Sequence, residues 1–106
     1  MFKIDQAPKF WQPVKFTLAG EEEQSFKVRF NVLPVSQVKD VDLNDGEQVH
    51  RFMDNVIGDV DDIEDEAGRK VPHSKDLVNR LLDQPHIRGA IMKAYFAGVA
   101  EAARGN

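Results

Sequence analysis

The sequence predicts an α+β fold, in which an N-terminal antiparallel β-hairpin is followed by three or four α-helices packed on one face. Apolar and polar residues alternate in two early segments with the period of two that is typical of half-buried strands. Later apolar residues recur every three or four positions, as they do on one face of a helix. Strands that come first and helices that follow are typical of α+β domains.

Length and composition narrow the classes of function. A chain of 106 residues with 42% apolar and 30% charged residues fits a single domain, residues 1–106. A net charge of −4 argues against general nucleic-acid binding, which needs Lys and Arg to neutralise phosphates. We find no cysteine, no signal-peptide core and no apolar run of membrane-spanning length. We therefore expect a cytoplasmic protein that binds other proteins and neither nucleic acid nor membranes.

The hairpin is predicted over residues 14–32, with strands at 14–18 and 25–32 joined by a turn at 19–24. Side chains that alternate along a strand share a face. One face is therefore apolar and carries Val14, Phe16, Leu18, Phe26, Val28, Phe30 and Val32. The opposite face is basic and carries Lys15, Lys27 and Arg29.

A helix is predicted over residues 44–57. Asn44 and Glu47 have the spacing of a capping box, in which each side chain bonds a backbone N–H of the first turn. The apolar stripe that follows consists of Val49, Phe52, Met53, Val56 and Ile57. Gly58 is predicted to end the helix.

The next segment, residues 59–73, is predicted to be an acidic loop that turns at Gly68. Helices are then predicted over residues 74–104. Ser74 caps the first of them, and Pro85 opens the second because proline is favoured at the first helical position.

No catalytic or cofactor-binding constellation is predicted. Glu47, His50 and Asp54 form a row along one helix, but the row lies off the apolar stripe and is interpreted as a solvated face. Three scattered histidines without cysteine do not suggest zinc. The acidic loop does not supply the ligand spacing of an EF-hand. We expect no enzyme, no cofactor and no metal.

Two surfaces of opposite charge remain: the basic hairpin face and the acidic loop. Ordinary surface charge is the simpler interpretation. The alternative is self-association, in which the acidic loop of one copy contacts the basic face of the next and builds rings or spirals. The candidate residues for this homo-oligomer are Lys15, Lys27, Arg29, Asp59, Asp61, Asp62, Glu64, Asp65 and Glu66.

The last helix is apolar over more of its circumference than one buried face requires. Tyr95, Phe96 and Val99 extend the apolar surface, either into the core or towards a partner protein. These three residues are the candidate partner-binding site.

The chain resembles the tail assembly chaperones of long-tailed bacteriophages (siphophages) and their prophages. The resemblance lies in five places: Val56, Ile57 and Gly58, the acidic turn to Gly68, the helix entry at Val71, Pro72, His73 and Ser74, residues 77–82, and residues 90–96. An aromatic residue often follows the glycine in the family pattern, whereas this chain has Asp59.

The resemblance implies a protein that binds the tape measure protein and promotes assembly of tail tube protein around it, and that is not retained in the virion. Two alternatives stay open. One is a structural tail or head-tail connector protein, which would remain in the particle. The other is a host regulatory module that binds one cytosolic protein.

Overall fold

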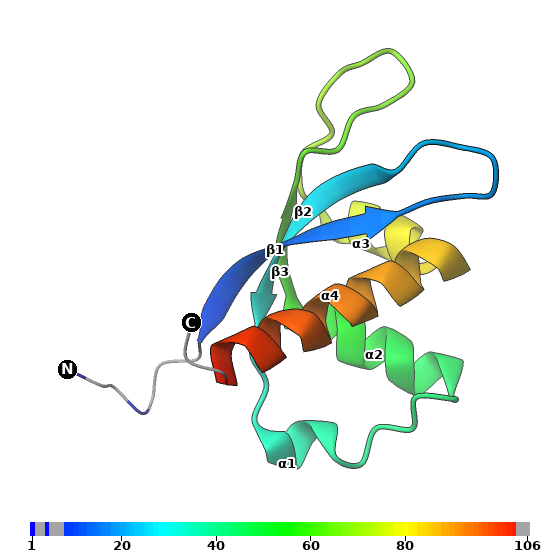
Figure 1. Cartoon of the computed structure of the whole chain (residues 1–106). Coiled ribbons are helices and arrows are strands. Elements are labelled where there is room, and N and C mark those ends of the chain that lie inside the picture. Colours follow the sequence, from blue (N-terminus) through cyan, green and yellow to red (C-terminus); the bar gives the residue numbers. More distant parts are fainter. Residues whose placement is uncertain (2–3, 5–7, 104–106) are drawn as a thin grey trace.

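The computed structural model describes residues 1, 4 and 8–103, and it has the predicted α+β fold. Strands β1 (Lys9–Phe16), β2 (Gln24–Asn31) and β3 (Ile57–Asp61) form an antiparallel sheet in the order β1-β2-β3. Four helices follow the hairpin: α1 (Val35–Val38), α2 (Gly46–Val56), α3 (Lys75–Leu82) and α4 (Pro85–Ala103). Figure 1 shows that α2, α3 and α4 lie on one side of the sheet.

The core lies between the inner face of the sheet and these helices. The hairpin contributes Val14, Phe26, Val28 and Phe30, all of which are buried as the alternation predicts. Tyr95 of α4 is central to an aromatic cluster and has ring contacts with Phe10, Phe30, Phe52 and Phe96. Leu18 lies beyond the end of β1 and is 39% exposed, so the predicted apolar face ends earlier than expected.

Strand β1 begins at Lys9, five positions before the predicted start at 14. The earlier residues also alternate, because Phe10 and Gln12 are partly buried while Trp11 and Pro13 are exposed. Proline cannot donate to a β-ladder and is therefore tolerated on edge strands. Its place in β1, at the sheet edge, satisfies that rule.

Helix α2 begins at Gly46, and its N-cap is Asp45 and not Asn44 as predicted. The Asp45 carboxylate accepts from the backbone N–H of Glu47 (3.0 Å) and of Gln48 (3.4 Å). Both residues are good caps, and the sequence pattern misplaced the cap by one residue.

The prediction of a loop from residue 59 was wrong for its first residues, because residues 57–61 form strand β3. Gly58 was expected to end the helix as a turn residue, but it lies within this strand. A Cβ at Gly58 would lie only 3.2 Å from the Arg29 carbonyl oxygen and 3.0 Å from Asn31 Oδ1. Glycine therefore allows β3 to approach β2 closely, beside the register shift between Arg29 and Phe30.

The C-terminal helices follow the prediction closely. Ser74 caps α3 by accepting from the Leu77 N–H at 3.0 Å, and Pro85 opens α4. Gly68 has a φ of +78° and forms the predicted turn. Residue 104, the predicted end of the last helix, lies outside the described residues. No helix in the described part of the chain is long and apolar enough to cross a membrane.

Candidate functional site

The outer face of the sheet, opposite the helices, brings most of the predicted charged residues together. Residues on neighbouring strands face each other in two rows across this surface. The first row is Trp11, Arg29 and Asp59, and the second is Pro13, Lys27 and Asp61. Because β3 is paired with β2, the basic and acidic residues are neighbours within one chain.

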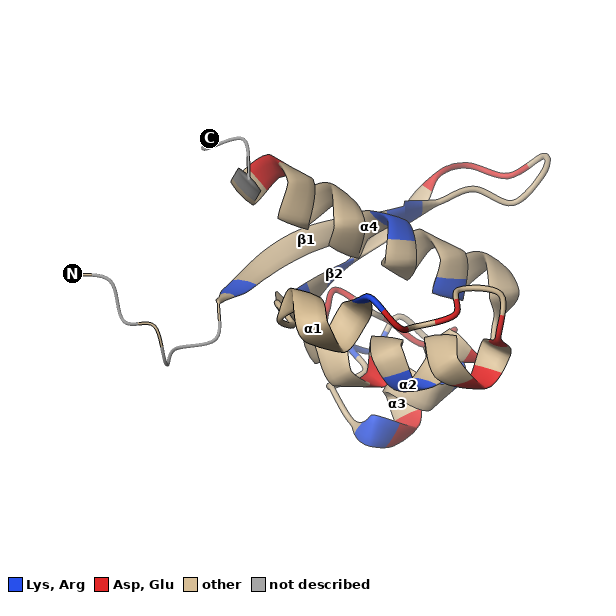
Figure 2. Ribbon diagram, turned by 90° about the horizontal axis from the view of Figure 1, so that it is seen from below, with Lys and Arg blue, Asp and Glu red and all other residues tan. Residues whose placement is uncertain are grey.

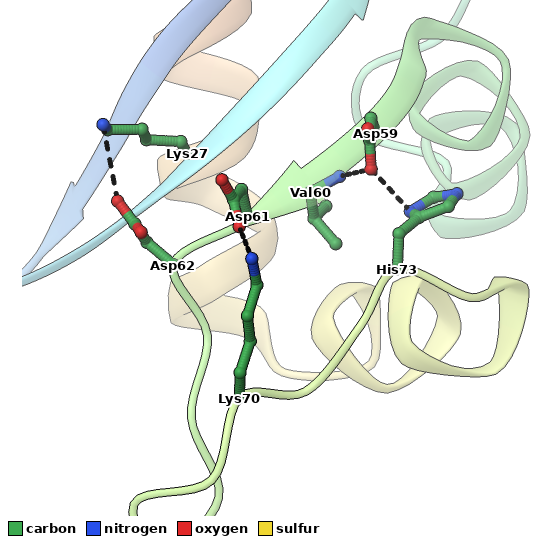
Figure 3. A network of polar contacts seen from close by, with 7 residues as sticks. All are labelled: Lys27, Asp59, Val60, Asp61, Asp62, Lys70 and His73. Atoms are coloured by element: carbon green, nitrogen blue, oxygen red, sulfur yellow. Dashed lines mark hydrogen bonds and ion pairs between the residues drawn. The ribbon is translucent and has the colours of Figure 1, made fainter.

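Several of these charges form ion pairs within the chain (Figure 3). Lys27 Nζ lies 3.5 Å from Asp62 Oδ2, and Lys70 Nζ lies 3.0 Å from Asp61 Oδ1. The hydrogen bond from Lys70 lowers the pKa of Asp61, and the same bond raises the pKa of Lys70. These side chains are largely exposed, so each pair contributes little to stability.

Asp59 is held in the same network. Its Oδ1 atom accepts from the Val60 N–H at 2.8 Å and lies 3.7 Å from Nδ1 of His73. The chain that returns from the turn at Gly68 thus places Lys70 and His73 beside β3. The side of β3 that does not pair with β2 is therefore bordered by the Lys70 and His73 side chains.

The rest of the predicted acidic loop forms a protruding arm, residues 62–70 (Figure 1). The Asp65 carboxylate accepts from the N–H groups of Ala67 and Arg69 and pairs with the Arg69 side chain. Glu64 and Lys70 form an isolated bridge across the arm. Asp62, Glu64, Asp65 and Glu66 are all exposed, and of these four Glu64 and Glu66 form no ion pair with a described residue.

A shallow pocket of about 420 Å³ lies on the outer face of the sheet. Its lining residues are Trp11, Gln12, Pro13, Lys27 and Asp61. Trp11 is the only tryptophan of the sequence and is 48% exposed. The sequence analysis did not predict Trp11 as a surface residue. The signal was present, because Trp11 alternates with Phe10 and Gln12 and so lies on the other face of β1.

The three residues of the predicted partner-binding site have different environments. Tyr95 is 2% exposed, and its hydroxyl accepts from the Leu33 N–H at 3.3 Å, so its ring offers almost no surface. Val99 is partly buried against the core. Phe96 stacks on Phe52, with ring centroids 6.1 Å apart, yet it remains 38% exposed.

The row Glu47, His50 and Asp54 does not converge on one point. His50 Nε2 lies 3.3 Å from Asn79 Oδ1, which connects α2 to α3. Within the described residues, no group of three or more His, Cys, Asp or Glu side chains is arranged to hold a metal ion.

Two surfaces are therefore candidates for binding: the outer sheet face around Trp11 and the α4 surface around Phe96. Comparison of the chain with protein-family models, with curated proteins and with solved structures finds no match.

Proposed function

We propose that this protein is a phage tail assembly chaperone, which binds the tape measure protein in the host cytoplasm and promotes tail tube assembly without remaining in the virion. The proposal has two parts, protein binding and the identity of the partner. The first is supported by the exposed ring of Phe96, and the second by the family resemblance of the sequence.

The exposure of Phe96 supports protein binding, because nothing in the packing of the core requires this aromatic ring to contact solvent. One side of the ring packs on Phe52 and Tyr95 in the aromatic cluster. The residue as a whole is nevertheless 38% exposed. Large aromatic side chains, Phe included, dominate the energetics of many protein interfaces.

The test is co-expression of the tagged protein with the tail genes of a phage that encodes it, followed by affinity purification. We expect the tape measure protein to be recovered with the wild-type chain and to be reduced at least about tenfold with Phe96→Ala. The matched control is Leu43→Ala, because Leu43 is 51% exposed and precedes α2. The control should retain the partner.

Melting temperatures of both variants are measured in parallel. A Phe96→Ala variant that loses the partner only because it unfolds would place Phe96 in the core and remove it from the site. Recovery of no tail protein by the wild-type chain would contradict the proposed function. A monomer in a one-to-one complex with a host protein would support a regulatory module instead.

The content of purified virions separates the chaperone from its structural rival. A chaperone is absent from finished particles, whereas a tail component or head-tail connector is present at a fixed copy number. Mass spectrometry of purified particles therefore decides between them.

A further inference from the structure

The exposed edge of β1 has backbone groups available for hydrogen bonding. The Val32 N–H donates to the Pro8 carbonyl oxygen at 2.9 Å, which fixes the alternation of hydrogen-bonded pairs along β1 and β2. Residues 10, 12, 14 and 16 thus bond to β2, and the backbone groups of residues 9, 11, 13 and 15 point away from it. No hydrogen bond among the described residues uses these outward groups.

A groove of about 350 Å³ lies beside this edge, between β1 and α4. Pro13 and Lys15 form part of its β1 wall, and the α4 wall consists of Ala90, Lys93, Ala94, Ala97 and Glu101. The alanines are too short to fill the space between helix and strand. An extended chain laid along β1 could therefore place alternate side chains over them.

The lysines of β1 and of the α4 wall form no ion pair with a described residue, unlike Lys27 of β2, and Glu101 is the one acidic residue of the groove lining. Lys27 Nζ is paired with the Asp62 carboxylate at 3.5 Å. Lys9, Lys15 and Lys93 are exposed and form no ion pair with a described residue. Figure 2 shows basic segments on both β1 and α4. These three lysines form a basic strip, which complements an acidic ligand although the whole protein has a net charge of −4.

We propose that this groove binds an extended, acidic segment of a partner protein, which adds to the sheet as a strand beside β1. The backbone of the segment would bond to the outward groups of Trp11, Pro13 and Lys15. Its acidic side chains would lie near Lys15 and Lys93, and small or medium apolar side chains would contact the alanines of α4.

Pro13 favours such a segment over a second copy of β1. It provides a carbonyl oxygen but no N–H, so it interrupts a regular ladder at the middle of the edge. Two β1 strands paired across a two-fold axis would both carry this interruption. A short segment of another protein pairs with a single β1 strand, so its ladder contains the Pro13 interruption only once.

The proposal does not depend on the tail-assembly function and is tested without tail proteins. The probe is a synthetic, end-blocked peptide of alternating Glu and Val, titrated to millimolar concentration into the isotopically labelled chain. We expect NMR shift changes at Trp11, Lys15 and Ala97, and slower hydrogen exchange at the Trp11 and Lys15 amides. The matching peptide of alternating Lys and Val should produce neither effect.

Two variants, each with a control variant, locate the binding. Ala97→Phe fills the groove from an exposed position and should abolish the shifts, whereas Ala102→Phe, exposed on the same helix outside the groove lining, should not. The double variant Lys15→Glu and Lys93→Glu should weaken binding about tenfold, while Lys75→Glu on α3 leaves it unchanged.

Three results would overturn the proposal. The first is the absence of shifts with the acidic peptide, and the second is an equal response to the basic peptide. The third is protection of the Trp11 and Lys15 amides that appears with rising protein concentration alone, since this would assign the edge to a second copy.

Discussion

Gly98 of α4 lies directly against the ring of Phe10 in β1, so that a Cβ at position 98 would overlap the Cε2 atom of that ring. The ring is partly buried and packs against the core. It also contacts Phe30, with centroids 5.5 Å apart, and Tyr95, with centroids 6.4 Å apart. Glycine at this position therefore sets how closely α4 approaches the sheet.

We expect Gly98→Ala to destabilise the domain. Overpacking costs about 1–3 kcal/mol, and the gain in helix propensity from glycine to alanine offsets about 1 kcal/mol of it. Urea unfolding followed by far-UV circular dichroism measures the difference. The same substitution at Gly89 is the control, because a Cβ there meets no atom within 4 Å. Gly89→Ala should stabilise the domain, and a destabilisation of equal size at both positions would contradict the explanation.

The Tyr95 hydroxyl accepts the N–H of Leu33, which follows the end of β2. Tyr95→Phe keeps the ring contacts but leaves this N–H without that acceptor. We expect a loss of about 1 kcal/mol in the free energy of unfolding, together with faster hydrogen exchange of the Leu33 amide. Unchanged exchange at Leu33 would show that the hydrogen bond does not hold this segment in solution.

The parts of the fold that the sequence predicted well are those with a long stretch of regular periodicity or a distinctive cap. The hairpin alternates over residues 25–32, and α3 has both an apolar stripe and Ser74 as its cap. Pro85 marked the start of α4 because proline fits the first turn of a helix better than its interior.

Strand β3 was missed for a physical reason. It has five residues, and its outward positions are Asp59 and Asp61, so its composition is that of a solvated loop. Its stability comes from pairing with β2 and from the burial of Val60, neither of which is visible in a local window. Part of the predicted acidic loop is therefore a strand, and its acidic residues lie opposite the basic residues of β2 within one chain.

Asp45 makes the start of α2 sensitive to acid. The hydrogen bond from the Gln48 side chain, with those from the Gln48 and Glu47 N–H groups, lowers the pKa of Asp45 below its usual value. A carboxyl group whose pKa is lower in the folded than in the unfolded state stabilises the folded state at pH values above the unfolded pKa. This contribution is lost as the pH falls through the folded pKa. The cap should therefore weaken below about pH 4.

The prediction is tested with Asp45→Asn, which keeps an oxygen acceptor but does not titrate. Unfolding free energies of the two proteins are compared from about pH 7 down to about pH 3. The difference between them should shrink as the pH falls, because only the wild type loses its charged acceptor. A constant difference across this range would show that the Asp45 charge does not contribute.

Lys27 is surrounded by carboxylates of its own chain, because it faces Asp61 across the ladder and pairs with Asp62. Lys27→Glu places like charges on neighbouring strands, which should destabilise the domain by about 0.5–1 kcal/mol and speed hydrogen exchange in β3. Lys15→Glu is the matched control, because Lys15 is on the same face and forms no ion pair with a described residue. Its stability should stay close to that of the wild type.

The same pair of variants tests charge-driven self-association, for which light scattering at low and high salt gives the oligomeric state. If the exposed Glu64 and Glu66 of one copy contact the basic face of another, Lys15→Glu should reduce the oligomer at low salt without altering the fold. Loss of the oligomer with Lys27→Glu alone would have a different cause, because that variant also disturbs β3. Oligomers that withstand both high salt and Lys15→Glu would exclude contact between these charges as the source of association.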